Sequence, residues 1–212
     1  MKKMVMAVLF LALAAAPAYA DTNALSNPGF ETGSISGWTS WTNYGHDYAY
    51  NINNWGHDGS SYSIHAWSWG EAGTSGGAWQ DFAITDPNQP LNVGGWIFQP
   101  SGDPLTGDVY AWLRIEFKNS SDTIVGTASS EHLQADDLIS DDWMHSSTVL
   151  TPSSYGSGIV KGTFVWEVKA DGTGSGSAMF DDMHVSAVPE PVSSVLFLLG
   201  GATLAVRRLR RK

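Results

Sequence analysis

The clearest pattern in the chain is the alternation of apolar and polar positions across residues 108–118. One face of this stretch is apolar and consists of Val109, Ala111, Leu113, Ile115 and Phe117. The other face consists of Tyr110, Trp112, Arg114, Glu116 and Lys118. A period of two is typical of a β-strand with one face in a core. We therefore expect the apolar face to be buried and the aromatic, charged face to be open; the alternative is an inner strand whose second face is covered by a loop.

Further stretches have strand-like composition and are separated by turn-rich segments. They are residues 47–52, 61–67, 78–84, 93–98, 123–127, 143–150, 160–169 and 177–185. Short strands separated by Gly-, Pro- and Asp-rich turns predict an all-β fold, a two-sheet antiparallel β-sandwich. The helical hint within this region is residues 131–139, over one or two turns.

The N-terminus has the pattern of a secretory signal peptide. Two lysines precede an apolar run, and Ala18-Tyr19-Ala20 is a small-x-small cleavage site. We expect a signal helix over residues 1–20, export by the Sec machinery, and cleavage between Ala20 and Asp21. The alternative is a short transmembrane anchor.

The C-terminus combines three features in a fixed order. Pro189-Glu190-Pro191 precedes an apolar run over residues 192–206, and five cations follow within the last six residues. This order resembles the PEP-CTERM class of exported bacterial proteins. The resemblance implies a hydrophobic helix in the inner membrane, processing by an exosortase-type enzyme, and delivery of the domain to the cell surface or the extracellular matrix. The alternative is a plain tail anchor that is never cut.

These segments leave one domain over residues 21–187, followed by the sorting segment 188–212. Residues 21–188 contain four of the 11 Lys and Arg but 20 of the 21 acids, a formal charge of −16. Such a charge makes nucleic acid an unsuitable partner, because phosphate binding needs a basic face. The chain has no cysteine, so no disulfide stabilises the domain, and a metal ion is one alternative.

A second resemblance rests on motifs along the whole domain. The opening run 23–31 reads NALSNPGFE and is followed by Gly37-Trp38. Later landmarks are Asp58-Gly59, Gln80, Trp143 and the closing run 180–185, FDDMHV. The domain thereby resembles jelly-roll carbohydrate-binding modules with the galactose-binding-like fold.

The second resemblance implies a structural calcium ion where the first and last strands meet. The positions that match the ligands of the family are Glu31, Asp58, Ser61 and, in the closing strand, either Asp181 or its neighbour Asp182. Calcium takes six to eight hard oxygen ligands and tolerates irregular geometry, which suits carboxylates and carbonyls from separate segments. The alternative is that these residues are hydrogen-bonded or solvated turn residues.

The ten Trp residues provide candidates for sugar stacking, although most are expected to pack. Trp38, Trp96 and Trp143 are assigned to packing. The expected open face makes Tyr110, Trp112, Arg114 and Glu116 the first ligand-binding candidates, with Trp67 and Trp69 as second candidates.

Catalysis has little support in the sequence. There is no cysteine nucleophile, Gly-x-Ser-x-Gly elbow or His-Glu-x-x-His motif. Glu116 and Glu167, on neighbouring strands, could lie at the distance that separates the two carboxyl groups of a glycosidase. Acids on any two neighbouring strands could do the same. We therefore expect a protein that is not an enzyme. One hypothesis is a non-catalytic module that binds extracellular polysaccharide, and the other is a structural or adhesive matrix protein that binds no sugar.

Overall fold

The computed structural model describes residues 22–43, 50–68 and 71–188. The expected signal peptide with Ala20 and Asp21, the Pro189-Glu190-Pro191 element, both terminal helices and Trp69 lie outside these residues. Residues 23–187 form one compact unit, and the two chain ends are grouped in a second unit. In the described part of the chain, no helix has the length and apolar character needed to cross a membrane.

Ten strands make up the described unit. Their bounds are β1 Thr39–Thr42, β2 Tyr50–Asn53, β3 Ser63–Ser68, β4 Ser75–Ala83, β5 Leu91–Phe98, β6 Val109–Asn119, β7 Ile124–Ser129, β8 Trp143–Leu150, β9 Ile159–Ala170 and β10 Gly176–Ala187. Two short 3-10 turns, η1 His57–Gly59 and η2 Pro152–Ser154, lie between strands. Every predicted strand has a counterpart among the described residues, with ends displaced by a few residues, and β1 is an additional strand. Positions 47–49 of the first predicted strand lie outside the described residues.

The helix expected over residues 131–139 is wrong. Leu133 instead forms an isolated bridge with Ala111, and the backbone amide of Asp137 donates to the carbonyl of Gln134 in a turn. This segment therefore lies along the end of β6 rather than forming a separate helix.

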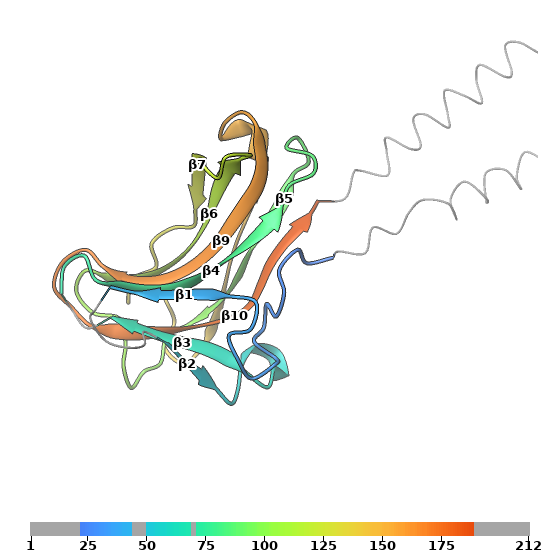
Figure 1. The fold of residues 1–212 in the computed structure, drawn as a ribbon. Coiled ribbons are helices and arrows are strands. Elements are labelled where there is room, and N and C mark those ends of the chain that lie inside the picture. The colour runs from blue at the N-terminus through green and yellow to red at the C-terminus, as the bar shows by residue number, and fades with distance from the viewer. Residues whose placement is uncertain (1–21, 44–49, 69–70, 189–212) are drawn as a thin grey trace, which may run out of the picture. The chain divides into compact units, whose positions relative to one another are not determined.

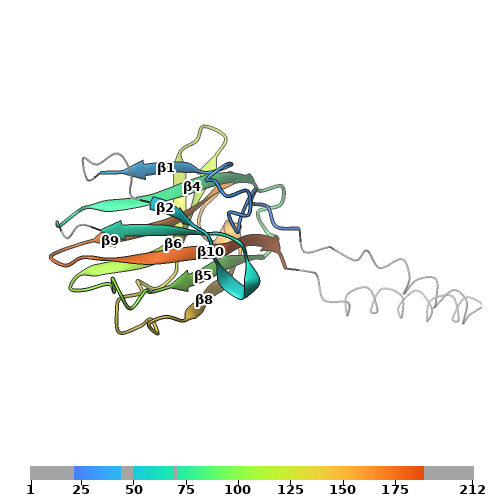
Figure 2. The same ribbon diagram turned by 90° about the horizontal axis from the view of Figure 1, so that it is seen from below.

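The strands form two antiparallel five-stranded sheets packed as a β-sandwich (Figure 1). Sheet A has the order β1-β4-β9-β6-β7, and sheet B has the order β2-β3-β10-β5-β8. Figure 2 looks onto sheet B and shows its strands side by side in this order. The long strand β9 bends along its length in Figure 1, so the outer face of sheet A is concave.

The core lies between the sheets and confirms the predicted register of β6. Val109, Leu113, Ile115 and Phe117 are 0–4% exposed. Their alternation with polar residues directs them inward, and the opposite set points to the outer face of sheet A. Trp38 is also in the core, as expected.

Trp96 and Trp143 correct the sequence interpretation. Both lie on the outer face of sheet B and are only partly buried. Their neighbours Ile97 and Met144 take the inward positions of β5 and β8. The apolar composition of its strand predicts a core position for Trp96, but the period of two assigns it to the other face.

The opening segment is fixed to both sheets by amide side chains. Asn23 donates to the carbonyl of Met183 (2.7 Å) and accepts from the amide of Val185 (3.1 Å), which attaches it to β10. Gln80 of β4 accepts from the amide of Ser26 and donates to the carbonyls of Ser26 and Gly37. The first residues of the domain are thereby held next to its last strand.

Candidate functional site

The outer face of sheet A carries aromatic side chains at two sides, Trp112 on one and Trp41 with Trp79 on the other, which we call the aromatic walls. The register places Trp112 of β6, Glu167 of β9, Gly77 of β4 and Trp41 of β1 in one row across the sheet. A Cβ atom at Gly77 would stand 2.8 Å from the ring of Trp41, so the ring lies over this glycine. The row therefore has a ring at each side and a carboxylate between them.

The adjacent row also has a ring at one side, Trp79, and has the cation Arg114 at the other. Arg114 of β6, Val165 of β9 and Trp79 of β4 lie side by side. The Arg114 guanidinium donates to Oε2 of Glu167 (2.6 Å) and Oε1 of Glu116 (3.0 Å), and its centre is 5.3 Å from the ring of Trp112. One arginine thus fixes both carboxylates in the middle of the face.

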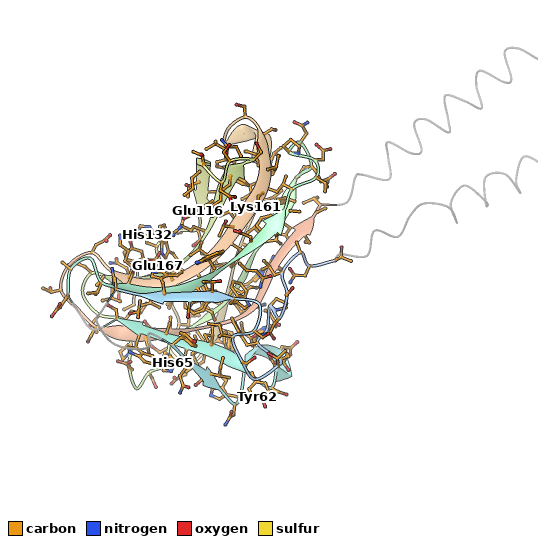
Figure 3. The ribbon with its side chains drawn as sticks, viewed as in Figure 1. Tyr62, His65, Glu116, His132, Lys161 and Glu167 are labelled. Carbon is orange, nitrogen blue, oxygen red and sulfur yellow. The ribbon has the colours of Figure 1, made fainter. Side chains whose placement is uncertain are left out.

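Trp112 is oriented by the same network. Its indole N–H donates to Oε2 of Glu167 at 2.8 Å, and the residue remains partly exposed. The predicted residues Trp112, Arg114 and Glu116 are therefore brought together, and Figure 3 shows Glu116, Glu167 and His132 on the same concave side.

The expectation of an open face is wrong for Tyr110. It is 3% exposed because His132 stacks on it, with ring centroids 4.0 Å apart and planes within 9°. Its hydroxyl donates to Asp171 (3.1 Å), and burial raises the pKa of this hydroxyl. The loop that contains His132 covers this end of the face, as in the alternative left open by the sequence. Tyr110 supports Trp112, which its ring meets edge-on at 5.8 Å.

A hollow of about 240 Å³ lies on this face beside Trp41 and Trp79, and Trp112 is not among the residues that line it. It is lined by Trp41, Trp79, Arg114, Glu116, Lys118, Thr163 and Val165. The sequence interpretation missed Trp41, Trp79 and His132 as site residues. The alternation of Trp79 and Asp81 with buried Gln80 and Phe82 could have assigned Trp79 to this face, whereas the positions of Trp41 and His132 depend on long-range pairing.

All four Lys and Arg residues of 21–188 lie on β6 and β9 and share this face: Arg114, Lys118, Lys161 and Lys169. Each is paired with an acid; Lys118, for example, stands 3.8 Å from both Asp81 and Glu116. The face is thus the one part of a very acidic domain where charges of both signs alternate.

A larger hollow of about 540 Å³ lies between the edges of the sheets at β7 and β8. Half of its lining residues are Ser or Thr; the others are Glu131, Leu133, Asp137, Met144 and His145, and none is Trp or Tyr. It therefore lacks a stacking surface for a sugar ring, and the sheet A face is the better candidate.

The predicted residue Trp67 lies elsewhere, on the outer face of sheet B beside His65 (centroids 5.6 Å apart). Burial lowers the pKa of His65. Trp67 and the Trp112 row therefore belong to opposite sheets and do not form one site.

Two of the predicted calcium ligands, Glu31 and Asp181, contact the same segment, residues 57–62. The carboxylate of Glu31 accepts from the Ser60 hydroxyl (2.5 Å) and from the backbone amides of Ser61 (3.3 Å) and Tyr62 (3.1 Å). The hydrogen bond from Ser60, followed by those from the two amides, holds the pKa of Glu31 below its usual value despite some desolvation.

Asp181 reaches the same place through an irregularity in β10. The register of β10 with β5 shifts between Asp181 and His184, and Asp182 has a φ of 46°. Asp181 is fully buried and accepts from the amides of His57 (2.7 Å) and Asp182 (2.8 Å). Burial raises the pKa of Asp181 to about 6, so the carboxylate lacks full compensation for its charge.

Two hard oxygens lie close to Gly56. A Cβ atom at Gly56 would collide with Oδ2 of Asp181 and the carbonyl of Tyr62, so both oxygens lie against this glycine. Among the described residues, no cluster of three or more Asp, Glu or His side chains could hold a metal ion. A calcium site here would therefore depend on carbonyl and hydroxyl oxygens as well, which calcium accepts.

The other predicted ligands lie at the margin of this cluster. Asp58 is exposed on the turn η1, and Ser61 contacts Glu31 through its backbone amide. Asp182 is exposed, and its Oδ2 lies 3.0 Å from Nδ1 of His57.

Comparison with known proteins shows which solved structures share this fold. No protein-family model and no curated protein sequence matches the chain. The carbohydrate-binding module TmCBM61, solved with β-1,4-galactotriose, aligns with a TM-score of 0.52 and 17% identity over 79% of this chain and 99% of that one. Other matched structures are carbohydrate-binding modules as well.

Other proteins with this fold have different activities. A Stig cyclase from Fischerella sp. TAU aligns with a TM-score of 0.55 and 14% identity over 80% of this chain and 98% of that one. Tailspike protein 4 of bacteriophage CBA120 aligns with a TM-score of 0.59 and 15% identity over 78% of this chain, which spans 21% of the tailspike chain. At these identities the likeness concerns the fold alone, so the function has to be argued from the site.

Proposed function

We propose that the chain is an exported, non-catalytic carbohydrate-binding protein whose sheet A face holds a neutral polysaccharide strand. The observation that carries the proposal is the pair of aromatic walls, Trp112 on one side and Trp41 with Trp79 on the other. Between them lie the hydrogen-bonding groups of Arg114 and Glu116. Aromatic faces stack on the apolar faces of sugar rings, and oriented polar groups then select among hydroxyl patterns.

The chemistry of the two glutamates supports binding rather than hydrolysis. A glycosidase places a substrate between its two carboxyl groups. Here one guanidinium occupies the space between Glu116 and Glu167 and donates to both. The carboxylates are then fixed as hydrogen-bond acceptors, which suits sugar hydroxyls.

Calcium is part of the proposal as a structural ion. Glu31, Asp181 and oxygens of the 60–62 segment would hold it, with Asp58, Ser61 and Asp182 as the further candidates named by the resemblance. The ion would supply positive charge to a buried carboxylate and join the start of the domain to its last strand. It would thereby replace the missing disulfides.

The proposed location follows from the two ends of the chain. Export through the Sec machinery, temporary anchoring in the inner membrane and processing by an exosortase-type enzyme would bring the domain to the cell surface or matrix. A polysaccharide ligand outside the cell agrees with this location.

The ring of Trp112 provides the test of sugar binding. Trp112→Ala should reduce the affinity of the purified full chain for β-1,4-galactan or xylan by tenfold or more in affinity electrophoresis, because loss of the ring removes the stacking surface. Trp112→Phe, which keeps a ring but loses the N–H bond to Glu167, should retain most of the binding.

Stability measurements separate binding from folding. Trp112→Ala should cost clearly less than the ~3–5 kcal/mol typical of a buried Trp, for which Trp166→Ala is the matched core variant. Unchanged binding by folded Trp112→Ala would reject the sheet A site. Absence of binding to all neutral polysaccharides tested would favour the structural matrix protein instead.

A further inference from the structure

A second set of aromatic rings lies on the outer face of sheet B, on the side of the sandwich away from Trp112. We call it the sheet B aromatic surface. It consists of Trp55, His57, Trp96, Phe98, Trp143, His145 and His184. Figure 3 shows the separation of the two sides: His65 of β3 and Tyr62 lie opposite His132 and Glu167.

Part of the sheet B aromatic surface is a support for the rest. The ring of Trp96 is stacked by His57 at 3.7 Å and within 16°, and His145 covers it from another side at 4.8 Å. His184 lies 5.5 Å beyond His145. Because neighbouring rings already cover Trp96, its role is to hold the imidazoles in place.

Two indoles form the accessible part. Trp55 is 43% exposed and meets Phe98 edge-on at 5.0 Å and Trp143 edge-on at 5.9 Å. Phe98 is almost fully buried beneath them, and its ring is 5.3 Å from Trp143. The two indoles therefore stand on a rigid base while part of their surface remains open to solvent.

Polar groups lie beside these rings. His145 is exposed on the edge strand β8, and the exposed carboxylate of Asp182 accepts a hydrogen bond from, or pairs with, Nδ1 of His57 at 3.0 Å. Open rings with hydrogen-bonding groups at their margin are the chemical combination that binds sugars.

Charge narrows the choice of ligand further. All Lys and Arg residues of 21–188 lie on the outer face of sheet A, so none is present on this side. A polyanion would therefore find no cation here, and a second copy of the chain would bring the same excess of acids. A neutral polysaccharide needs no cation and is not repelled by the acids.

We propose that the sheet B aromatic surface is a second carbohydrate-binding site, with Trp55 and Trp143 as the stacking residues and His145 as a hydrogen-bonding neighbour. The two sites face opposite directions, so one molecule can hold two polysaccharide strands and cross-link them. This inference goes beyond binding at the sheet A face, although both sites take the same class of ligand.

Stoichiometry tests the proposal. Native mass spectrometry and calorimetry of the purified full chain with β-1,4-galactotriose and with xylotriose should give two bound oligosaccharides for the better ligand. Trp55→Ala/Trp143→Ala and Trp112→Ala should each leave one, and the triple variant none. Turbidity of galactan or xylan solutions should increase with the wild type and with neither single-site variant, because cross-linking needs both sites.

Controls keep a loss of folding apart from a loss of binding. Trp55→Phe keeps a ring and should retain the second site, and Val149→Ala changes an exposed residue of β8 away from the rings and should alter nothing. Wild-type stoichiometry of one that is unaffected by Trp55→Ala/Trp143→Ala would overturn the second site and leave the sheet A proposal standing. If the wild type binds one oligosaccharide and only Trp55→Ala/Trp143→Ala loses it, the result would support the sheet B site and overturn the sheet A proposal. If the wild type binds none of the oligosaccharides tested, both proposed sites are overturned.

Discussion

At the scale of single residues, Asp181 combines complete burial with incomplete charge compensation. Burial raises its pKa from 3.8 to about 6. A carboxyl group whose pKa is higher in the folded than in the unfolded state stabilises the fold below the unfolded value. That stabilisation is lost as the pH rises through the folded value. The difference between the two pKa values corresponds to at most about 3 kcal/mol.

We therefore predict a pH effect in the presence of EDTA. Between about pH 4 and pH 6, the free energy of unfolding of the wild type should decrease relative to that of Asp181→Asn, by up to about 3 kcal/mol. The comparison with Asp181→Asn removes the contributions of other acids, such as Glu31, whose pKa is lowered. Chemical denaturation across this pH range measures the difference; a constant difference would contradict the prediction. Calcium at pH 7 should stabilise the wild type and leave Asp181→Asn unchanged.

Single residues also show what local pattern can predict. The alternation in β6 correctly assigned Val109 and Phe117 to the core, because the side-chain period of a strand is a local property. Tyr110 was expected to be open but is covered by His132, which comes 22 residues later in the chain and is not placed by any local pattern. Arg114 and Glu116 lie side by side on one face of β6, as the period of two predicts.

At the scale of elements, the segment from Gly56 to Tyr62 has no regular structure apart from the turn η1 and depends on contacts at both of its ends. Glu31 holds Ser61 and Tyr62 at one end, and Asp181 holds His57 at the other. A segment fixed by a few side chains can open locally without unfolding of the sheets. Its order therefore reports directly on the candidate calcium site.

We predict that Glu31→Gln increases hydrogen–deuterium exchange in this segment several-fold, because the variant loses the charge that holds the amides of Ser61 and Tyr62. Exchange in β6 and β9 should remain unchanged. Glu131→Gln, at an exposed position, is the matched control. In the wild type, calcium should slow exchange at the same amides and chelator should restore it. Equal exchange in the two variants would contradict a role for Glu31 in ordering the segment.

Elements differed in how well the sequence revealed them. Long alternating strands such as β6 and β9 were predicted because their patterns extend over 11 and 12 residues. The four-residue strand β1 was missed, because its pairing with β4 rather than its own composition defines it. The composition of residues 131–139 predicts a helix, but the bridge between Leu133 and Ala111 holds them against β6. Convergence of Glu31 with Asp181 was expected from the family resemblance and not from spacing in the sequence.

At the scale of the whole molecule, charge is distributed unevenly along the chain. Residues 21–188 carry a formal charge of −16, whereas the last six residues carry five cations. Residues 192–206 between them contain no charge. Cations next to an apolar span stay on the cytoplasmic side of a membrane, so the acidic domain is expected on the other side. This orientation agrees with the predicted N-terminal signal peptide.

The length of the apolar run leads to the last prediction. As a helix, its 15 residues would reach about 22 Å, against about 30 Å for a bilayer core, so it spans only with help from Leu209 and the long stems of the arginines. Such a span beside Pro189-Glu190-Pro191 suits a temporary anchor. We predict that mass spectrometry of the exported protein, from a strain with the processing enzyme, finds no peptide containing Arg207 to Lys212. An intact C-terminus would reject cleavage and favour the plain tail anchor. Deletion of the tail should release the domain from the membrane fraction in either case, and retention of the deleted form there would reject anchoring through this segment.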